Sequence, residues 1–135
     1  MAARRVRYVA LHVPSRAGRG AAVLEAVAKA GIDLLAFTGF PERGGAQIDL
    51  VTDDLAKLRR VAKAEGWRLA PEKRAFLIQG RDRVGAVHRE LAKLARAGIN
   101  VTAVDAVSAG GGRFGMILWV KPGDYPRAAR ALRAR

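Results

Sequence analysis

The fold is decided by residues 80–101, which read GRDRVGAVHRELAKLARAGINV. A polar, glycine-bearing loop at 80–85 precedes an amphipathic stretch, and Ala97-Gly98 ends that stretch before an apolar run begins at Ile99. The apolar residues of the stretch recur at helical spacing, and glycine is a common helix terminator. We therefore predict a loop, a helix over 84–97 and a strand that starts at Ile99.

The same plan occurs earlier in the chain, where the loop 14–18 opens a second amphipathic stretch. Gly18 corresponds to Gly85, which lies 67 residues later, and Ala30-Gly31-Ile32 corresponds to Ala97-Gly98-Ile99. A repeat of this kind indicates two copies of one loop–helix–strand unit.

The remaining periodicities complete the two copies. The first copy, 1–71, is predicted to contain strands at 7–13, 32–40, 46–52 and 67–70, and helices at 21–30 and after an N-cap at Asp53. Its apolar second strand is expected to be central in the sheet. The second copy, 72–135, is predicted to contain strands at 74–79, 99–107 and 114–120, and helices at 84–97 and after Asp124.

This order predicts an α+β chain of two ferredoxin-like βαββαβ units, the second of which lacks its final strand. The edge left by that strand must be open or covered by another segment or subunit. Together with the apolar strand 114–120, this edge predicts a homodimer.

Composition limits the class of protein. The chain has 135 residues and no cysteine, so disulfides, thiolate metal sites and thiol nucleophiles are excluded. No apolar run reaches the roughly 20 residues that cross a bilayer, and the N-terminus lacks the apolar core of a signal peptide. We expect a cytoplasmic protein with no membrane partner.

The net charge is +13, from 25 basic and 12 acidic residues. Residues 1–71 carry 12 bases and 7 acids (+5), and residues 72–135 carry 13 bases and 5 acids (+8). The excess is therefore spread along the chain. A basic nucleic-acid-binding or transcription-regulatory protein remains an alternative, which the lack of an aromatic platform makes the less favoured one.

The sequence offers little for catalysis. His12 and His88 are the only histidines, and structural or solvent-facing roles suit both. There is no HExxH, Walker or clustered metal-ligand pattern, and the glycines at 110–112 fit a hairpin turn. We expect a protein that is not an enzyme and holds neither cofactor nor metal.

The loops 14–20 and 80–85 are better candidates for a binding site, because each leads into a helix N-terminus that favours an anion. Asp82 and Asn100 are expected near the same end, where they supply an acceptor and an amide. Such a set suits an amino acid. The alternative, in which Asp82 only caps the helix and Asn100 only begins a strand, stays open.

The pattern Asp82-Arg83-Val84-Gly85, a helix and then 97–101 (AGINV) resembles the "D-x-P-G … A-G-I-N-I" motif of ACT domains, the small regulatory modules that bind amino acids. The whole chain resembles a tandem pair of them. The resemblance implies a stand-alone sensor that binds an amino acid or related small carboxylate at the interface of two ACT-like units. Such a sensor either acts on a regulated enzyme or regulator or only binds its ligand.

The resemblance also implies the site residues, namely Arg81, Asp82, Arg83, Val84, Gly85, Asn100 and Val101 in the second copy, and Ser15, Arg16, Ala17, Gly18 and Asp33 in the first. The first copy departs from the motif, with Ser15 in place of Asp82 and Asp33 in place of Asn100. Val84 stands where the family usually has proline.

A hydrolase like the acylphosphatases is a further alternative. These enzymes share the βαββαβ plan and use a loop arginine with an asparagine, which Arg81 and Asn100 resemble. Their glycine-rich loop is not reproduced, and the duplication would be unexplained.

Overall fold

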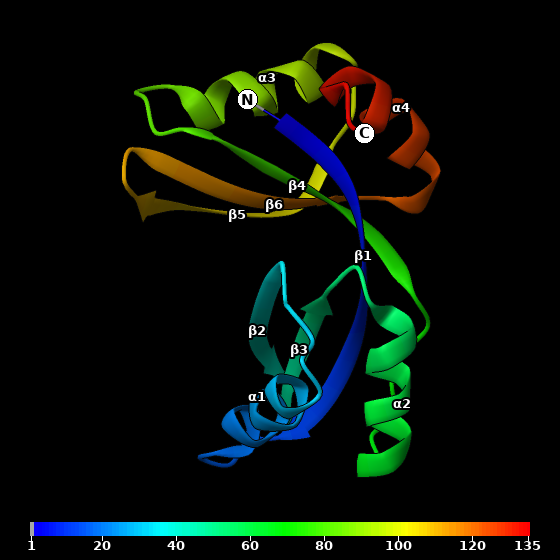
Figure 1. Cartoon of the computed structure of the whole chain (residues 1–135). Helices are drawn as coiled ribbons and strands as arrows, with labels where there is room; N and C mark the ends of the chain where they lie inside the picture. Colours follow the sequence, from blue (N-terminus) through cyan, green and yellow to red (C-terminus); the bar gives the residue numbers. More distant parts are fainter. Residues whose placement is uncertain (1) are drawn as a thin grey trace. The chain divides into compact units, whose positions relative to one another are not determined.

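The structure is a computed structural model that describes residues 2–135. It divides into two compact units (Figure 1). The inserted unit is the continuous segment Arg7–Lys73, and the discontinuous unit combines residues 2–6 with Arg74–Arg135. The prediction of an α+β chain made of two ferredoxin-like units is confirmed.

The inserted unit is a sheet with two helices on one face (Figure 1). Its strands lie in the order β2-β3-β1, with antiparallel pairing of β3 to both neighbours. Its elements are the second part of β1 (Ala2–Pro14), α1 (Arg19–Lys29), β2 (Ala36–Glu42), β3 (Gly45–Val51) and α2 (Leu55–Glu65). Val9, Leu11, Ile48 and Leu50 from the strands pack with Val27 and Leu58 from the helices.

Three details of this unit differ from the expectations. Asp54 rather than Asp53 caps α2, because its carboxylate accepts a hydrogen bond from the Lys57 amide at 3.1 Å. The short fourth strand at 67–70 is reduced to one bridge between Leu69 and Leu11.

The second strand is an edge strand rather than a central one, and it begins at Ala36 instead of residue 32. Its residues are mostly exposed, with Phe37 39% and Phe40 46% accessible. An apolar run fits an edge strand as well as a central one, so the apolar composition of this strand was not enough to predict its position in the sheet.

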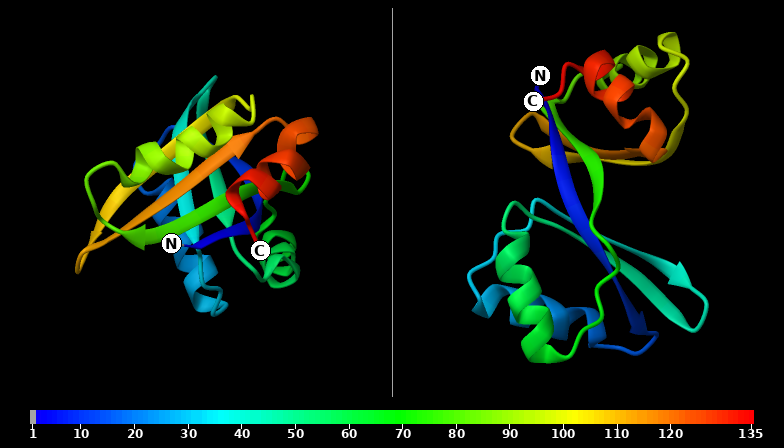
Figure 2. Two further views of the ribbon diagram at one scale, coloured as in Figure 1. Left: turned by 90° about the horizontal axis from the view of Figure 1, so that it is seen from above. Right: turned by 90° about the vertical axis from the view of Figure 1, so that its right-hand side faces the viewer.

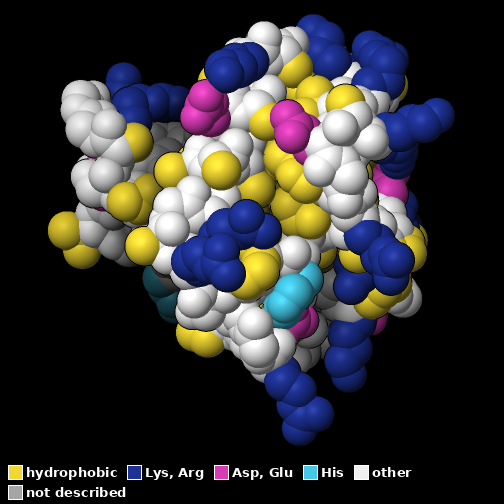
Figure 3. Space-filling view, turned by 90° about the horizontal axis from the view of Figure 1, so that it is seen from below, with side chains coloured by type: hydrophobic (Ala, Val, Ile, Leu, Met, Phe, Trp, Pro, Cys, Tyr) yellow, Lys and Arg dark blue, Asp and Glu magenta, His cyan; other side chains and the backbone are white. Residues whose placement is uncertain are grey.

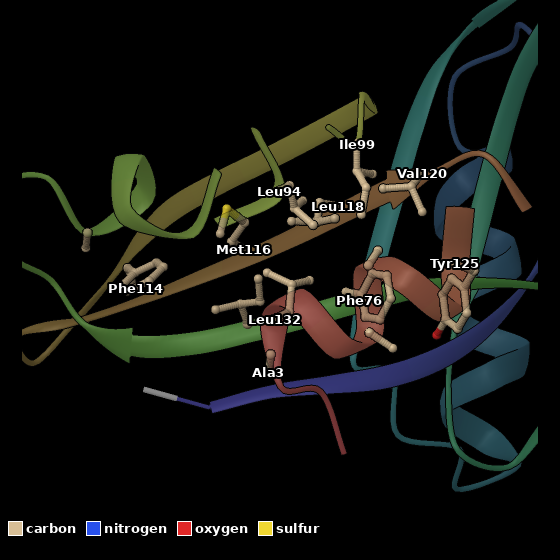
Figure 4. Packing of buried hydrophobic residues seen from close by; sticks show 14 residues of the cluster. Ala3, Phe76, Leu94, Ile99, Phe114, Met116, Leu118, Val120, Tyr125 and Leu132 are labelled. Atoms are coloured by element: carbon tan, nitrogen blue, oxygen red, sulfur yellow. The ribbon is translucent and has the colours of Figure 1, made fainter. Parts of the chain in front are cut away.

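The discontinuous unit has the strand order β1-β4-β6-β5 and two helices on one face (Figure 1). Its elements are the first part of β1, β4 (Lys73–Arg81), α3 (Ala86–Arg96), β5 (Val101–Gly110), β6 (Arg113–Val120), the 3-10 turn η1 (Pro122–Asp124) and α4 (Tyr125–Leu132). Phe76, Met116 and Leu118 from the strands pack with Leu94 and Leu132 from the helices (Figure 4).

Strand β1 supplies the strand that the second copy lacks. Residues 2–6 lie beside β4 in the discontinuous unit, whereas the rest of β1 pairs with β3 in the inserted unit. The edge that the sequence left open is therefore covered by the start of the chain itself, and Ala3 joins the core of that unit. The structure thus assigns residues 2–6 to the second copy, whereas we expected all of 1–71 in the first.

The C-terminus lies beside the start of β1 (Figure 2). The Arg5 amide donates to the Arg135 carbonyl at 2.9 Å, and the Arg135 amide donates to the Ala3 carbonyl at 3.1 Å. Within residues 2–135, no helix has the length and apolar character needed to cross a membrane.

Candidate functional site

The loop between β4 and α3 leaves the helix N-terminus without a side-chain cap. Gly85 is the N-cap residue, with φ of +81°, and no side chain accepts from the first turn. Asp82 forms hydrogen bonds elsewhere. Its carboxylate accepts from the Ser108 hydroxyl at 2.8 Å, and its backbone amide donates to the Gly112 carbonyl at 2.9 Å. Asp82 therefore ties the loop to the β5–β6 hairpin and does not cap the helix. Val84 is fully exposed.

The expectation that Asn100 lies near the same end as this loop is wrong within the unit. Arg81 pairs with Arg113 at one end of β6, whereas Val101 pairs with Val120 at the other. Those β6 residues are seven positions apart, or about 23 Å at roughly 3.3 Å per residue. The reason is that α3 carries the chain back along the sheet before β5 begins. The pairing of Arg81 with Asn100 in the hydrolase alternative fails for the same reason.

Four arginines gather at the loop end of the discontinuous unit. A pocket of about 360 Å³ is lined by Arg81, Arg83, Arg89 and Arg113. The sequence singled out the two in the loop. It missed Arg89, on the first turns of α3, and Arg113, which comes close only through its register with Arg81.

The corresponding loop of the inserted unit has the same backbone design. Gly18 is the N-cap of α1, with φ of +87° and no side-chain cap. The loop residues Ser15, Arg16 and Ala17 are exposed. Asp33 follows the far end of α1, where its carbonyl accepts from the Thr52 hydroxyl at 2.8 Å, so it too is separated from the loop.

A second pocket, of about 390 Å³, lies in the inserted unit beside this loop. Three segments line this pocket: the end of β1, the first turns of α1, and the end of α2 with the residues after it. The lining residues are Leu11, His12, Val13, Pro14, Arg19, Ala22, Val23, Glu65, Gly66, Trp67 and Arg68. Pro14 and Arg19 belong to the loop 14–20 that was expected to bind a ligand, whereas the other nine lining residues were not expected from sequence. The lining residues come from three separated segments, and no spacing in the sequence predicts that these segments lie together.

The two pockets differ in charge. The first presents only guanidinium groups, whereas the second presents Arg19 and Arg68 together with Glu65 and the partly exposed indole of Trp67. Within residues 2–135, neither of these two arginines nor Glu65 forms an ion pair.

The ends of two helices also give the second pocket opposite polarity. Arg19 begins α1, where the helix dipole is positive, and Glu65 ends α2, where it is negative. The pocket is therefore lined by a basic side chain at the positive end of one helix dipole and by an acidic side chain at the negative end of another.

The histidines and the surface offer less. His12 Nδ1 lies 2.6 Å from the Glu42 carboxylate in an exposed pair, and His88 is exposed on α3. In the described part of the chain, no three His, Asp or Glu side chains gather in a way that would hold a metal ion. On the face shown in Figure 3, Lys and Arg side chains stand in several separate groups with Asp or Glu between them.

No protein-family model and no curated protein matches the chain. Solved structures share its fold at low sequence identity. A protein from Bacteroides thetaiotaomicron matches with a TM-score of 0.77 and 16% identity, over 97% of this chain and 87% of that one. The ligand-free regulatory subunit of aspartate kinase from Thermus thermophilus matches with a TM-score of 0.61 and 19% identity, over 96% and 91%.

The Clostridium acetobutylicum aspartate kinase, an allosteric enzyme, matches with a TM-score of 0.59 and 12% identity. The match covers 97% of this chain and 32% of the kinase chain. At these identities the likeness establishes the shared fold.

Proposed function

We propose that this chain is a regulatory module without catalytic function, and that it binds an amino acid or a related small carboxylate in the pocket of the inserted unit. The observation that carries the proposal is the meeting of two opposite helix ends in one pocket. The start of α1 brings Arg19, and the end of α2 brings Glu65.

The carboxylate of the ligand would lie at the α1 side. Gly18 leaves the first turn of α1 without a side-chain cap, so amide groups there remain available to an anion. The Arg19 and Arg68 guanidiniums line the same pocket, and each forms bidentate hydrogen bonds with a carboxylate readily. An exposed loop with glycine at positive φ also lets the backbone approach the ligand.

The ammonium group would lie at the α2 side. Glu65 supplies a carboxylate, and the last carbonyls of the helix favour a cation. A simple carboxylic acid uses only the α1 side, so the acidic side favours an amino acid over its deaminated analogue.

The ligand side chain would contact the indole of Trp67. Leu11, Val13 and Val23 line the same pocket and are nearly buried, so Trp67 offers the larger accessible apolar surface. A flat apolar wall favours a side chain with aliphatic or aromatic carbon over a second charged group.

The regulatory part of the proposal is supported by the structural likeness to aspartate kinase regulatory subunits and to an allosteric aspartate kinase. Those proteins are described as regulatory subunits or as allosteric enzymes. For this chain, the partner would be an enzyme or regulator whose activity responds to the bound amino acid.

Calorimetry of the full chain with each of the 20 standard amino acids tests the proposal. Glu65→Gln should weaken binding roughly tenfold to hundredfold, the cost of losing one charge-assisted hydrogen bond. Glu25→Gln is the matched control, because Glu25 is an exposed acid of α1 that pairs with Lys29 and does not line the pocket.

Asn100→Ala and Asp82→Ala add a second arm. These residues lie in the discontinuous unit, so both variants should bind as the wild type does. Loss of binding in them, with Glu65→Gln unaffected, would place the amino acid where the sequence motif predicted it. Failure of every amino acid to bind the wild type would refute the function itself.

A further inference from the structure

We propose that the four-arginine pocket of the discontinuous unit binds a small molecule that carries a phosphate or diphosphate group. Arg81, Arg83, Arg89 and Arg113 line a hollow of about 360 Å³. This site is separate from the amino-acid pocket of the inserted unit and does not depend on it.

The first observation is that Arg81 and Arg113 are directly opposite each other in the β4–β6 ladder. Side chains in such positions have Cβ atoms about 5 Å apart, and like charges there destabilise a sheet. Within residues 2–135, none of the four lining arginines forms an ion pair with an acid. The fold therefore holds an uncompensated positive cluster that an anion would stabilise.

The charge of the pocket favours phosphate over a carboxylate. A single carboxylate offsets one of four guanidinium charges, whereas a phosphate monoester carries a charge of about −2 with three strong acceptor oxygens. Arginine is the side chain best matched to such groups, because its planar fork donates to two oxygens at once.

The same charge disfavours an amino acid. No acidic side chain lines the pocket, so an ammonium group would face only guanidiniums. Asp82 is the nearest acid in sequence, and its carboxylate is engaged by the Ser108 hydroxyl at 2.8 Å.

Helix α3 strengthens the anion site. Its N-cap is Gly85, which provides no side-chain acceptor for the first-turn amides, and Arg89 projects from the same helix into the pocket lining. The helix dipole adds to the arginine charge where a phosphate would lie. In α2, by contrast, Asp54 occupies the equivalent acceptor position.

The pocket is suited to a small molecule rather than to a nucleic-acid strand. It is confined to four residues, and its volume lies toward the lower end of the roughly 300–1,000 Å³ that small-molecule sites span. Its lining contains no aromatic side chain on which a base would stack.

The test uses inorganic pyrophosphate as the probe, with the full chain at constant ionic strength. Binding is measured by calorimetry on the wild type, on the double variant Arg81→Gln/Arg113→Gln, and on Arg43→Gln/Arg60→Gln. The last variant is the matched control, because it removes the same charge from exposed arginines of the inserted unit. Inorganic phosphate, citrate and a single-stranded oligonucleotide are titrated alongside.

We expect pyrophosphate to bind the wild type and the control equally, and to bind the pocket variant roughly tenfold to hundredfold more weakly. Without ligand, the pocket variant should melt no lower than the wild type, because a like-charge pair has been removed, so a folding defect cannot account for lost binding. Equal binding to both double variants, or no binding to the wild type, would overturn the proposal. Binding of the oligonucleotide alone, or of citrate more tightly than pyrophosphate, would overturn it as well.

Discussion

The amide of Arg5 donates to the carbonyl of Arg135 at 2.9 Å, so the first strand of the chain is hydrogen-bonded to its last residue. Arg135 also donates to the Ala3 carbonyl at 3.1 Å, and residues 2–6 lie beside β4 on the other side. The start of β1 is thus bordered on both edges within the discontinuous unit. Its role there is structural, because it completes the four-stranded sheet.

Ala3→Asp should destabilise the discontinuous unit strongly. Ala3 is buried in the core cluster with Phe76 and Leu132, and an unpaired charge there costs about 3 kcal/mol or more. Ala2→Asp is the control on the same strand, since Ala2 is exposed, and it should change stability by less than about 0.5 kcal/mol. Urea denaturation measures both. Equal stability of the two variants would show that residues 2–6 do not form the missing strand.

Gly45→Ala should destabilise the inserted unit by about 1–3 kcal/mol. A Cβ at Gly45 would overlap the carbonyl oxygen of Val13, which belongs to the neighbouring strand and cannot move without shifting the ladder. Gly39→Ala is the control, because its added Cβ would meet only the Gln47 carbonyl oxygen at an ordinary 3.8 Å. The difference in melting temperature between the two variants checks the register of β1 against β3, and no difference would contradict it.

Tyr125→Phe should cost about 1–2 kcal/mol at pH 7. The buried Tyr125 hydroxyl donates to the Ala75 carbonyl at 2.9 Å, while the ring stacks on Phe76 with centroids 4.3 Å apart. The substitution removes the hydrogen bond and keeps the ring stack, so the loss of unfolding free energy measures the contribution of the hydroxyl group. Denaturant titration of the two proteins gives the value, and equal stability would contradict the bond.

The same residue predicts a pH dependence. Burial raises the pKa of the Tyr125 phenol above its ordinary value, although the Arg74 and Arg5 guanidiniums act in the opposite direction. A group whose pKa is higher in the folded state stabilises the fold below its unfolded pKa of about 10, and that contribution is lost as pH rises through the folded value. Wild type should therefore lose more stability between about pH 9 and pH 12 than Tyr125→Phe does. Identical pH profiles for the two proteins would contradict the raised pKa.

Much of the fold was predictable from sequence because it rests on local patterns. The match of Gly18 to Gly85 identified the duplication, and both glycines prove to be helix N-caps at positive φ. The glycine turn after β5 was also expected. By contrast, the exchange of residues 2–6 into the other unit has no local signal, because β1 is one continuous strand whose two parts differ only in their distant partners.

The candidate site was less predictable, because it depends on register and on which segments meet. Asp82 and Asn100 were grouped by a short motif, yet a helix that runs back along the sheet separates them. Arg113 joins Arg81 only through the β4–β6 register, and Glu65 reaches the pocket beside Arg19 only through packing of α2 near α1. The spacing of these residues in the sequence predicts neither of the two juxtapositions.

Self-association remains a prediction, but its expected surface changes. The edge left by the missing strand is filled by residues 2–6, and strand β6 is an inner strand with Phe114, Met116 and Leu118 buried. Strand β5 is the remaining edge of the discontinuous unit. Nearly all of its ten residues are exposed, and Asp105 is its only charge.

Such an edge is a template for pairing with another chain unless charges, prolines or bulges prevent it. Strand β5 has one charge and no proline, and its register shifts lie near its two ends, between Val101 and Ala103 and between Ser108 and Gly110, so its middle can still pair. We therefore expect a homodimer in which two copies of β5 pair. Val107, which is 66% exposed on this strand, should be a sensitive position. Val107→Lys should give a monomer, because it places an added positive charge on the pairing edge of each copy.

Val84→Lys is the matched control, because it makes the same change at a fully exposed loop residue outside the strand. Sedimentation velocity over a range of concentrations should give a dimer for the wild type and for Val84→Lys, and a monomer for Val107→Lys. A Val107→Lys dimer as stable as that of the wild type would move the interface away from β5. A wild type that stays monomeric at every concentration would refute self-association itself, and repulsion from the net charge of +13 would then have to keep the β5 edges of two copies apart.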